Sequence, residues 1–314
     1  MQFLKAFGYS RGARGNTDTL RDMKQEPRTL HRLEKIVAVF ALFAVLALTI
    51  GFAQGAAGSD LHEKVFLRSA VALVQDAASG ETILAKNPEV VLPIASITKL
   101  MTAMVVLDAR LNLGQRVAIS GEDLDMVKGT RSRLRPGSVL TRDELLLLAL
   151  MASENRAAAA LARTHPGGAD AFVAAMNAKA QALAMHDTHF ADPTGLSSAN
   201  VASAQDLAKL ARAAHGYSLI REYSTRDSAT VYALGRPLAY RNTNGLVRSA
   251  SWHIGLSKTG YISEAGRCLV MRVRVASREL VVVLLDSWGR YSRIGDANRI
   301  RKWLESSASA GRRG

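Results

Sequence analysis

A serine and a lysine spaced for one helix face are the first candidates for chemistry. In Ser96-Ile97-Thr98-Lys99 the two side chains are three positions apart. Residues with this spacing are neighbours on a helix, so the hydroxyl would lie beside the ammonium. A helix N-terminus and burial both favour a neutral amine and an activated hydroxyl, which makes Lys99 a candidate general base for a Ser96 nucleophile. Alone this pattern is weak, because Ser-x-x-Lys occurs by chance in many proteins.

Two further patterns supply polar groups that suit acyl transfer. Ser153 and Asn155 follow the apolar run of residues 145–151, where a hydroxyl can relay a proton and an amide can hold a substrate carbonyl. The alternative is that these residues only cap a helix. Lys258-Thr259-Gly260 offers a fixed positive charge, a hydroxyl, and a glycine that leaves room for a substrate backbone along a strand.

The three patterns gain weight from their order and spacing, 57 and then 105 residues apart. Together they resemble the motif set of the penicillin-recognising serine enzymes: Ser-x-x-Lys, Ser-x-Asn and Lys-Thr-Gly. The chain is most similar to the low-molecular-weight penicillin-binding proteins of the D-alanyl-D-alanine peptidase family, and within it to the endopeptidase branch of the penicillin-binding protein 7 type. The resemblance extends over about residues 65–305. The supporting segments are residues 92–102, 151–158, 192–196, 242–244 and 255–261.

The resemblance implies a mechanism and a catalytic set. Ser96 would attack the carbonyl of a D-alanine residue while Lys99 takes its proton. Ser153, with Lys258, would pass a proton to the leaving amine. Water would then release the acyl-enzyme, and a β-lactam would acylate Ser96 and stay.

The resemblance also implies how the substrate is held. Asn155 and Thr259 would position it, and Gly260 would leave room for it. The backbone N–H groups of Ser96 and Tyr261 would form the oxyanion hole, which is often the largest single catalytic contribution. No metal or cofactor is implied.

One residue favours cross-links as the substrate. Carboxypeptidase members of the family usually carry arginine in the segment that matches residues 242–244, where this chain has Thr243. The departure weakens recognition of a free terminal carboxylate and favours endopeptidase over carboxypeptidase activity. The expected partners are therefore peptidoglycan peptide stems and cross-links, with β-lactams as covalent inhibitors and a role in cell-wall biogenesis and cell shape.

Carboxypeptidase members often have a second β-rich domain and an amphipathic anchor, and we expect neither here.

Three other functions would use some of the same residues. A β-lactamase would share the motifs, but between Asn155 and Lys258 the only glutamate is Glu222, and no Glu-x-x-Leu-Asn occurs. A murein-binding protein without activity would not need the nucleophile and bases present. A metallopeptidase site could be read in His186, Asp187, His189 and Asp192, for which a surface turn is the simpler interpretation. The Arg-rich residues 129–134 are either part of the cleft or a solvated loop.

The apolar patterns place these motifs in an α+β fold. Residues 70–76 and 81–86 predict a hairpin, as do residues 269–276 and 280–285 across a turn at Ser277-Arg278-Glu279. Between them lie predicted helices at residues 96–109, 145–151 (after a capping box at Thr141 and Glu144), 157–162, 169–184 and 204–214. We expect one antiparallel sheet built from both chain ends, flanked by helices, with an inserted helical block. The resemblance implies the β-lactamase/DD-peptidase-like fold.

The C-terminal region and the lone thiol have simple interpretations. Residues 294–304 predict an amphipathic helix, with packing on the sheet favoured over membrane binding by its basic face. Cys268 is the only cysteine, and we expect it to be buried in a strand.

Composition agrees with an exported enzyme that acts on an anionic polymer. The chain of 314 residues carries a net charge of +14, and residues 54–314 keep 33 basic against 23 acidic side chains. The basic residues are scattered without aromatic interleaving, which argues against nucleic acid and suits the carboxylate-bearing cell wall.

The N-terminal segment has the layout of a secretory signal. Basic residues precede an apolar stretch at residues 36–50, and small residues follow, with cleavage expected near Ala53 or Ala57. An uncleaved anchor is the alternative, and residues 1–22 are consistent with an upstream start assignment. The expected organisation is a leader at 1–57, a catalytic domain at 58–307 and a flexible tail at 308–314, in a protein exported by the Sec pathway to the periplasm.

Overall fold

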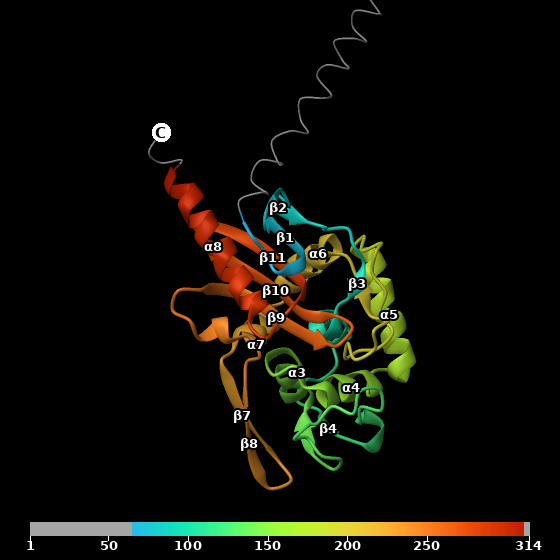
Figure 1. The fold of residues 1–314 in the computed structure, drawn as a ribbon. Helices are drawn as coiled ribbons and strands as arrows, with labels where there is room; N and C mark the ends of the chain where they lie inside the picture. The colour runs from blue at the N-terminus through green and yellow to red at the C-terminus, as the bar shows by residue number, and fades with distance from the viewer. Residues whose placement is uncertain (1–64, 311–314) are drawn as a thin grey trace, which may run out of the picture. The chain divides into compact units, whose positions relative to one another are not determined.

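A five-stranded antiparallel sheet forms the centre of the computed structural model, which describes residues 65–310. These residues belong to one compact unit, Ala57–Gly314. The strand order is β2-β1-β11-β10-β9, so the two N-terminal strands pair with three C-terminal ones through β1 and β11. This confirms the expected sheet built from both chain ends (Figure 1). The strands are β1 (Ser69–Asp76), β2 (Thr82–Lys86), β9 (His253–Ile262), β10 (Gly266–Val275) and β11 (Arg278–Ser287).

The turn between β10 and β11 is shorter than the sequence suggested. The predicted connection at Ser277-Arg278-Glu279 is wrong, because Arg278 and Glu279 already belong to β11 and pair with Val275 and Arg274. The turn is made by Ala276 and Ser277, which have φ of 48° and 70°. Two central residues with positive φ give a hairpin turn whose twist matches that of the strands.

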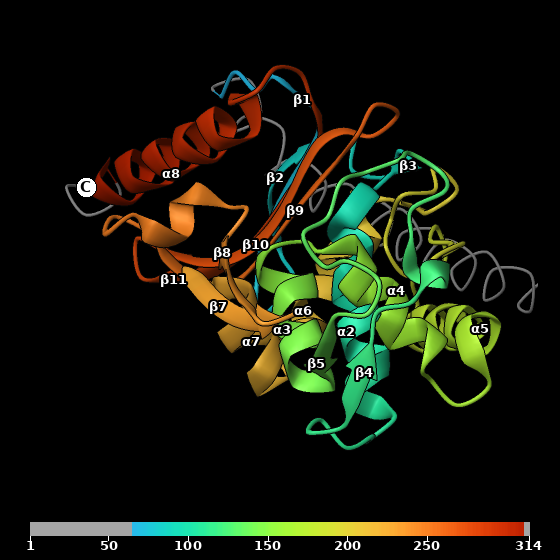
Figure 2. The same ribbon diagram turned by 90° about the horizontal axis from the view of Figure 1, so that it is seen from below.

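Helices cover both faces of the sheet (Figure 2). Helix α8 (Ser292–Ala310) packs on one face, where Ala297, Ile300 and Leu304 are buried with residues of β1, β10 and β11. Helix α6 (Ala204–His215) packs on the other face. Sheet packing of the C-terminal helix is therefore confirmed. Helix α8 continues to Ala310, beyond residue 307, where the catalytic domain was expected to end.

The remaining helices form the block inserted between the two parts of the sheet, as expected from the sequence. Thr141 and Glu144 make the predicted capping box at the start of α3. The helices are α2 (Lys99–Asp108), α3 (Arg142–Met151), α4 (Asn155–Arg163), α5 (Gly168–Ala182) and α7 (Ser218–Thr225). Short elements complete the described chain: β3 (Leu92–Pro93), β4 (Arg116–Ala118), β5 (Val139–Thr141), β6 (Val201–Ala202), β7 (Ser228–Ala233), β8 (Arg236–Arg241), and the 3₁₀ turns η2 (Ala95–Thr98), η3 (Gly121–Asp123) and η4 (Gly245–Arg248).

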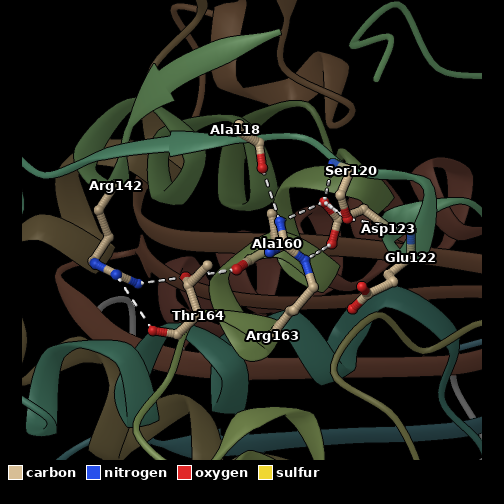
Figure 3. Close-up of polar contacts among 8 residues, drawn as sticks. All are labelled: Ala118, Ser120, Glu122, Asp123, Arg142, Ala160, Arg163 and Thr164. Carbon is tan, nitrogen blue, oxygen red and sulfur yellow. Dashed lines mark hydrogen bonds and ion pairs between the residues drawn. The ribbon is translucent and has the colours of Figure 1, made fainter. Parts of the chain in front are cut away.

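Arginines fasten the polar segments of this block to its helices (Figure 3). Arg163 of α4 donates two hydrogen bonds of 2.9 Å to the carboxylate of Asp123 and one of 2.8 Å to the carbonyl of Ala118. Arg142 donates to the hydroxyl of Thr164 at 3.0 Å. The turn η3 and strand β4 are thereby attached to α4.

The segment around Ser96 differs from the prediction in one respect. The expected α-helix at residues 96–109 begins only at Lys99, and Ser96 lies in η2. Residue Ala95 has a φ of 48°, and the N–H of Ile97 donates to the carbonyl of Ile94 at 3.3 Å, so the chain makes a 3₁₀ turn before the α-helix begins. In a 3₁₀ turn residues three apart are eclipsed, so the shift keeps Ser96 and Lys99 together.

Cys268 lies buried in β10, as expected. The predicted leader at residues 1–57 lies outside the described residues. Within residues 65–310, no helix has the length and apolar character needed to cross a membrane.

Candidate active site

Ser96 and Lys99 form the centre of the site. The Lys99 Nζ lies 2.9 Å from the Ser96 Oγ, 2.7 Å from the Asn155 Oδ1 and 2.6 Å from the carbonyl oxygen of Thr194. The lysine is fully buried, whereas Ser96 is half-buried. A buried amine therefore contacts a reachable hydroxyl.

Burial changes the protonation of Lys99. Loss of water around the ammonium lowers its pKa to about 7, and the nearby Asp192 and Glu154 carboxylates oppose this only in part. A substantial fraction of Lys99 is therefore neutral at neutral pH, which is the form that can accept a proton.

Ser153 lies at the junction of α3 and α4 in a left-handed conformation, with φ of 58°. Its Oγ accepts a hydrogen bond of 2.8 Å from the Nζ of Lys258, which also donates to the carbonyl of Thr259 at 3.0 Å. The helix cap considered for Ser153 and Asn155 is supplied instead by Glu154, which accepts from the backbone N–H of Arg156. The side chains on either side of Glu154 are thus left for the site.

Lys258 is a second buried amine. Burial, followed by the positive charges of Lys99 and Arg293, holds its pKa well below the usual range. Two lysines therefore each contact a serine hydroxyl, and the charge of Lys99 disfavours the charged form of Lys258.

Strand β9 is one of the two edge strands of the sheet and lies against the turn that holds Ser96. A Cβ on Gly260 would lie 2.8 Å from the carbonyl oxygen of Ile94 and 3.2 Å from the backbone nitrogen of Ser96. Only glycine permits this approach. Thr259 is linked to Thr243 by a hydrogen bond of 2.6 Å between their hydroxyls.

These groups open into one cavity of about 500 Å³. Six of the predicted site residues line it, while Lys99 and Lys258 are buried at contact distance behind their serines. The structure therefore brings together every predicted site residue. The lining consists of Ser96, Lys128, Thr130, Ser153, Asn155, Leu196, Thr243, Thr259, Gly260, Tyr261, Ile262, Ser263 and Arg293.

Sequence reasoning missed Arg293, which reaches the cavity from α8. Its Nη1 donates to the carbonyls of Gly260 at 2.9 Å and Cys268 at 3.3 Å. One sequence signal pointed to it: an arginine in the first turn of a helix opposes the helix dipole, which suggests another role. Lys128 was also missed, and it pairs with Glu264 across the cavity wall.

Residues of the Arg-rich segment at 129–134 lie both in the cleft and in a loop outside it. Thr130 lines the cavity and accepts a hydrogen bond of 3.1 Å from the Asn155 Nδ2. Arg133, in contrast, lies over the ring of Tyr240 and contacts the carbonyl of Ala239.

The carboxylate weighed as a metal ligand has other partners. Asp192 accepts hydrogen bonds from the backbone N–H groups of Thr194, Gly195 and Ser197, and from the Thr194 hydroxyl. It stabilises the turn that carries the Thr194 carbonyl to Lys99.

Comparison with known sequences points in the same direction as the geometry. Residues 60–288 match the family model described as D-alanyl-D-alanine carboxypeptidase. The chain is 46% identical over 279 residues to a D-alanyl-D-alanine endopeptidase of Pseudomonas aeruginosa, covering 88% of this chain and 89% of that protein. It is 44% identical over 276 residues to a D-alanyl-D-alanine endopeptidase of Escherichia coli, covering 86% and 88%.

Solved structures give the same fold. The DD-transpeptidase of Streptomyces K15 superposes with a TM-score of 0.71 at 28% identity, over 77% of this chain and 98% of that one. A D-alanyl-D-alanine carboxypeptidase of Mycobacterium tuberculosis superposes with a TM-score of 0.70 at 26% identity, over 80% and 95%. The DD-peptidase fold expected from the sequence is confirmed.

Proposed function

This chain belongs to the D-alanyl-D-alanine carboxypeptidase family, and from that premise we propose that it is a penicillin-sensitive serine peptidase that hydrolyses D-alanyl peptide bonds of peptidoglycan, preferentially in cross-links. The observation that carries the proposal is the pairing of each of two buried lysines with a serine hydroxyl at one cavity.

The contacts of Lys99 support its role as the general base. A neutral lysine has two N–H donors and one lone pair. The two carbonyl oxygens, of Asn155 and Thr194, accept the donors at 2.7 and 2.6 Å. The lone pair is then directed at the Ser96 hydroxyl 2.9 Å away. As the Ser96 Oγ attacks the D-alanine carbonyl, its proton passes to Lys99.

The oxyanion formed in this step needs donors. The backbone N–H groups of Ser96 and Tyr261 are the proposed pair, because Gly260 lets β9 approach the Ser96 backbone closely. Asn155 and Thr259, which both line the cavity, would position the substrate. A peptide added along the edge of β9 would present its carbonyl to these groups.

Breakdown of the tetrahedral intermediate requires a proton on the leaving amine. The Ser153 hydroxyl, hydrogen-bonded to Lys258, is placed to donate it, and its oxygen then regains a proton through Lys258, balanced by the proton that Lys99 removed from Ser96. The C–N bond breaks, and the acyl group stays on the Ser96 Oγ as an ester. Water then attacks the ester and regenerates the hydroxyl. A β-lactam acylates Ser96 in the same way but retains its leaving group.

The preference for cross-links rests on Thr243. Its hydroxyl bonds to that of Thr259, so the position contributes a neutral group to the cavity wall where a carboxypeptidase of the family usually has arginine. The endopeptidase names of the relatives at 44–46% identity support the same preference. D-alanyl-D-alanine carboxypeptidase activity is the second candidate, favoured by Arg293, a cation that lines the cavity.

We further propose that the catalytic domain, from about residue 58, acts in the periplasm after Sec-dependent export directed by residues 1–57. The segment at residues 36–50, preceded by basic residues and followed by small ones, supports this proposal.

The test is covalent labelling with a fluorescent penicillin. Residues 58–314 and a Ser96→Ala variant are incubated with the reagent, and the fluorescence that survives denaturation is measured. We expect label on the parent and none on the variant. A folded parent that takes no label would contradict the proposed catalytic role and favour a murein-binding protein. Product analysis on cross-linked and monomeric muropeptides then separates the two peptidase activities.

A further inference from the structure

We propose that Asp125 and Thr130 are positioning residues that fix the rotation of the Asn155 amide, so that its carbonyl oxygen faces Lys99 and the lysine lone pair stays on Ser96. The inference rests on the proposed function of Lys99 and adds two residues outside the three motifs that supply the catalytic groups.

A continuous chain of hydrogen bonds joins the loop to the nucleophile. One oxygen of Asp125 accepts from the backbone N–H of Thr130 at 2.8 Å and from its hydroxyl at 2.6 Å. The Thr130 Oγ1 in turn accepts from the Asn155 Nδ2 at 3.1 Å. The Asn155 Oδ1 accepts from the Lys99 Nζ at 2.7 Å. Three side chains, those of Thr130, Asn155 and Lys99, thus connect a loop carboxylate to Ser96.

The direction of each hydrogen follows from the chemistry of the groups. An ionised carboxylate only accepts, so the single Thr130 hydroxyl hydrogen is directed at Asp125. The Thr130 oxygen then offers only lone pairs to Asn155 and must face the amide N–H₂. The opposite end of the amide, its carbonyl oxygen, is therefore turned to Lys99.

The reverse orientation of the amide would disable the base. With the N–H₂ group toward Lys99, an amide N–H would compete with the Ser96 hydroxyl for the lysine lone pair. The Lys99 N–H that now reaches the Asn155 Oδ1 would lose its acceptor. Asp125 and Thr130 therefore act on the reaction through Asn155 without touching the reacting atoms.

The loop that carries Asp125 and Thr130 is held against the helix that carries Asn155. At its start, Arg163 of α4 binds Asp123, as Figure 3 shows. At its end, the Nη1 of Arg156 donates to the carbonyl of Leu134 at 2.7 Å. The second oxygen of Asp125 folds the segment between by accepting from the N–H groups of Val127 and Lys128 at 2.8 and 2.9 Å.

Asp125 is suited to a permanent acceptor role. Partial burial raises the pKa of Asp125, but the hydrogen bonds from the Thr130 hydroxyl and three backbone N–H groups outweigh it and lower the pKa to about 2. The carboxylate therefore stays ionised at any pH at which the enzyme would act.

The experiment measures the rate constant for acylation by a fluorescent penicillin as a function of pH in the 58–314 protein. The variants are Thr130→Val, Thr130→Ser and Asp125→Asn. In the parent, acylation should rise with pH as Lys99 loses its proton near pH 7. The charged groups that face Lys99 are Lys258, Asp192 and Glu154, and none of these variants changes them.

We expect Thr130→Val and Asp125→Asn to acylate about 10- to 100-fold more slowly, because the base is misdirected. Their pH limb should move about one unit lower, because the ammonium loses an acceptor for its charged form. Thr130→Ser keeps the hydroxyl and should restore both the rate and the limb. A variant that is merely less well folded would lose amplitude without moving the limb.

Matched controls separate this effect from a general loss of a Thr–Asp bond. Thr188 also donates its hydroxyl to a carboxylate, that of Asp206 at 2.9 Å, and does not line the cavity. Thr188→Val should leave rate and limb unchanged. The inference is overturned if the parent is labelled at Ser96 but Asp125→Asn keeps the parental rate and limb, or if Thr130→Ser behaves as Thr130→Val. An unlabelled parent would instead contradict the proposed function.

Discussion

At the scale of single residues, the site depends on burying amines beside hydroxyls. Desolvation penalises an ammonium more than any nearby charge in this cavity compensates, so the pKa values of Lys99 and Lys258 both fall. The sign of this effect on stability follows. The unfolded chain keeps these protons up to about pH 10.5, and the folded chain releases them at lower pH, so both lysines make folding more favourable as pH rises, starting near pH 7 for Lys99.

Thr243 is the residue on which substrate choice is expected to depend. Replacing it with arginine places a planar cation with several donors at the cavity wall, where it can bind a free terminal carboxylate through two parallel hydrogen bonds. For Thr243→Arg we predict a shift of about tenfold or more in the ratio of carboxypeptidase to endopeptidase products. The measurement is chromatography of muropeptides after digestion of a pentapeptide monomer and of a cross-linked dimer.

The control for this substitution adds the same charge at an exposed position outside the cavity. Thr230 is exposed on β7 and does not line the site. Thr230→Arg should leave the product ratio unchanged. An unaltered ratio in Thr243→Arg, with the protein still labelled by penicillin, would show that carboxylate recognition depends on other groups.

At the scale of elements, the predictable parts were those with clean apolar patterns. The hairpin of β1 and β2, the paired strands β10 and β11, and helices α3 to α6 have such patterns and lie where expected. Strand β9 and the β7–β8 hairpin were not predicted. Along β9 the buried positions include Ser257, Lys258 and Thr259, which are polar because they build the site. The patterning rule fails there because function takes precedence over burial of apolar side chains.

The site was predictable where short sequence motifs supply the catalytic groups. It was not predictable where side chains on other helices and loops reach the cavity. Ser96, Lys99, Ser153 and Lys258 follow from pattern and resemblance. Arg293 did not, because it depends on how α8 crosses the sheet. The contact between Thr130 and Asn155 depends on the path of an irregular loop, whose turns come from single carboxylates such as Asp125 that accept several backbone N–H groups.

The attachment of α8 to β1 depends on one buried carboxylate, and its removal should lower the stability of the fold by a measurable amount. Asp296 is fully buried on α8 and accepts from the backbone N–H groups of Arg68 at 3.0 Å and Ser69 at 2.7 Å, and from the Ser69 hydroxyl at 2.5 Å. Asp296→Ala leaves the two backbone N–H groups without this acceptor and removes one of two partners of the Ser69 hydroxyl, the other being Ser287, so we predict a loss of about 3 kcal/mol in the free energy of unfolding. Urea denaturation followed by circular dichroism gives the value.

An exposed carboxylate provides the comparison. Glu222 is 61% exposed and pairs with Arg226 across one helical turn at 3.9 Å. Glu222→Ala should cost less than about 0.5 kcal/mol, because exposed pairs contribute little. Equal effects of the two substitutions would mean that the Asp296 contacts do not hold α8 on the sheet.

At the scale of the whole molecule, the fold places the nucleophile between two separately built parts. Ser96 and Asn155 come from the helical block, whereas Thr259 and Gly260 come from the edge of a sheet closed by both chain ends. The cavity therefore exists only when β1, from the start of the described chain, is paired with β11, from near its end. Labelling by penicillin thus reports the assembly of the complete fold.

Net charge acts at the same scale and predicts a salt effect that depends on the substrate. With 33 basic against 23 acidic side chains in residues 54–314, the protein attracts a polymer that bears many carboxylates more strongly than a small monoanion. Between about 0.05 and 0.5 M salt the screening length falls severalfold. We therefore predict that hydrolysis of isolated peptidoglycan falls about tenfold over this range, whereas the rate of penicillin acylation changes less than about twofold. Release of soluble muropeptides and the rate of fluorescent labelling are measured in the same salt series. An equal decline in both would assign the effect to the catalytic groups, and no decline in either would mean that the basic surface does not recruit the polymer.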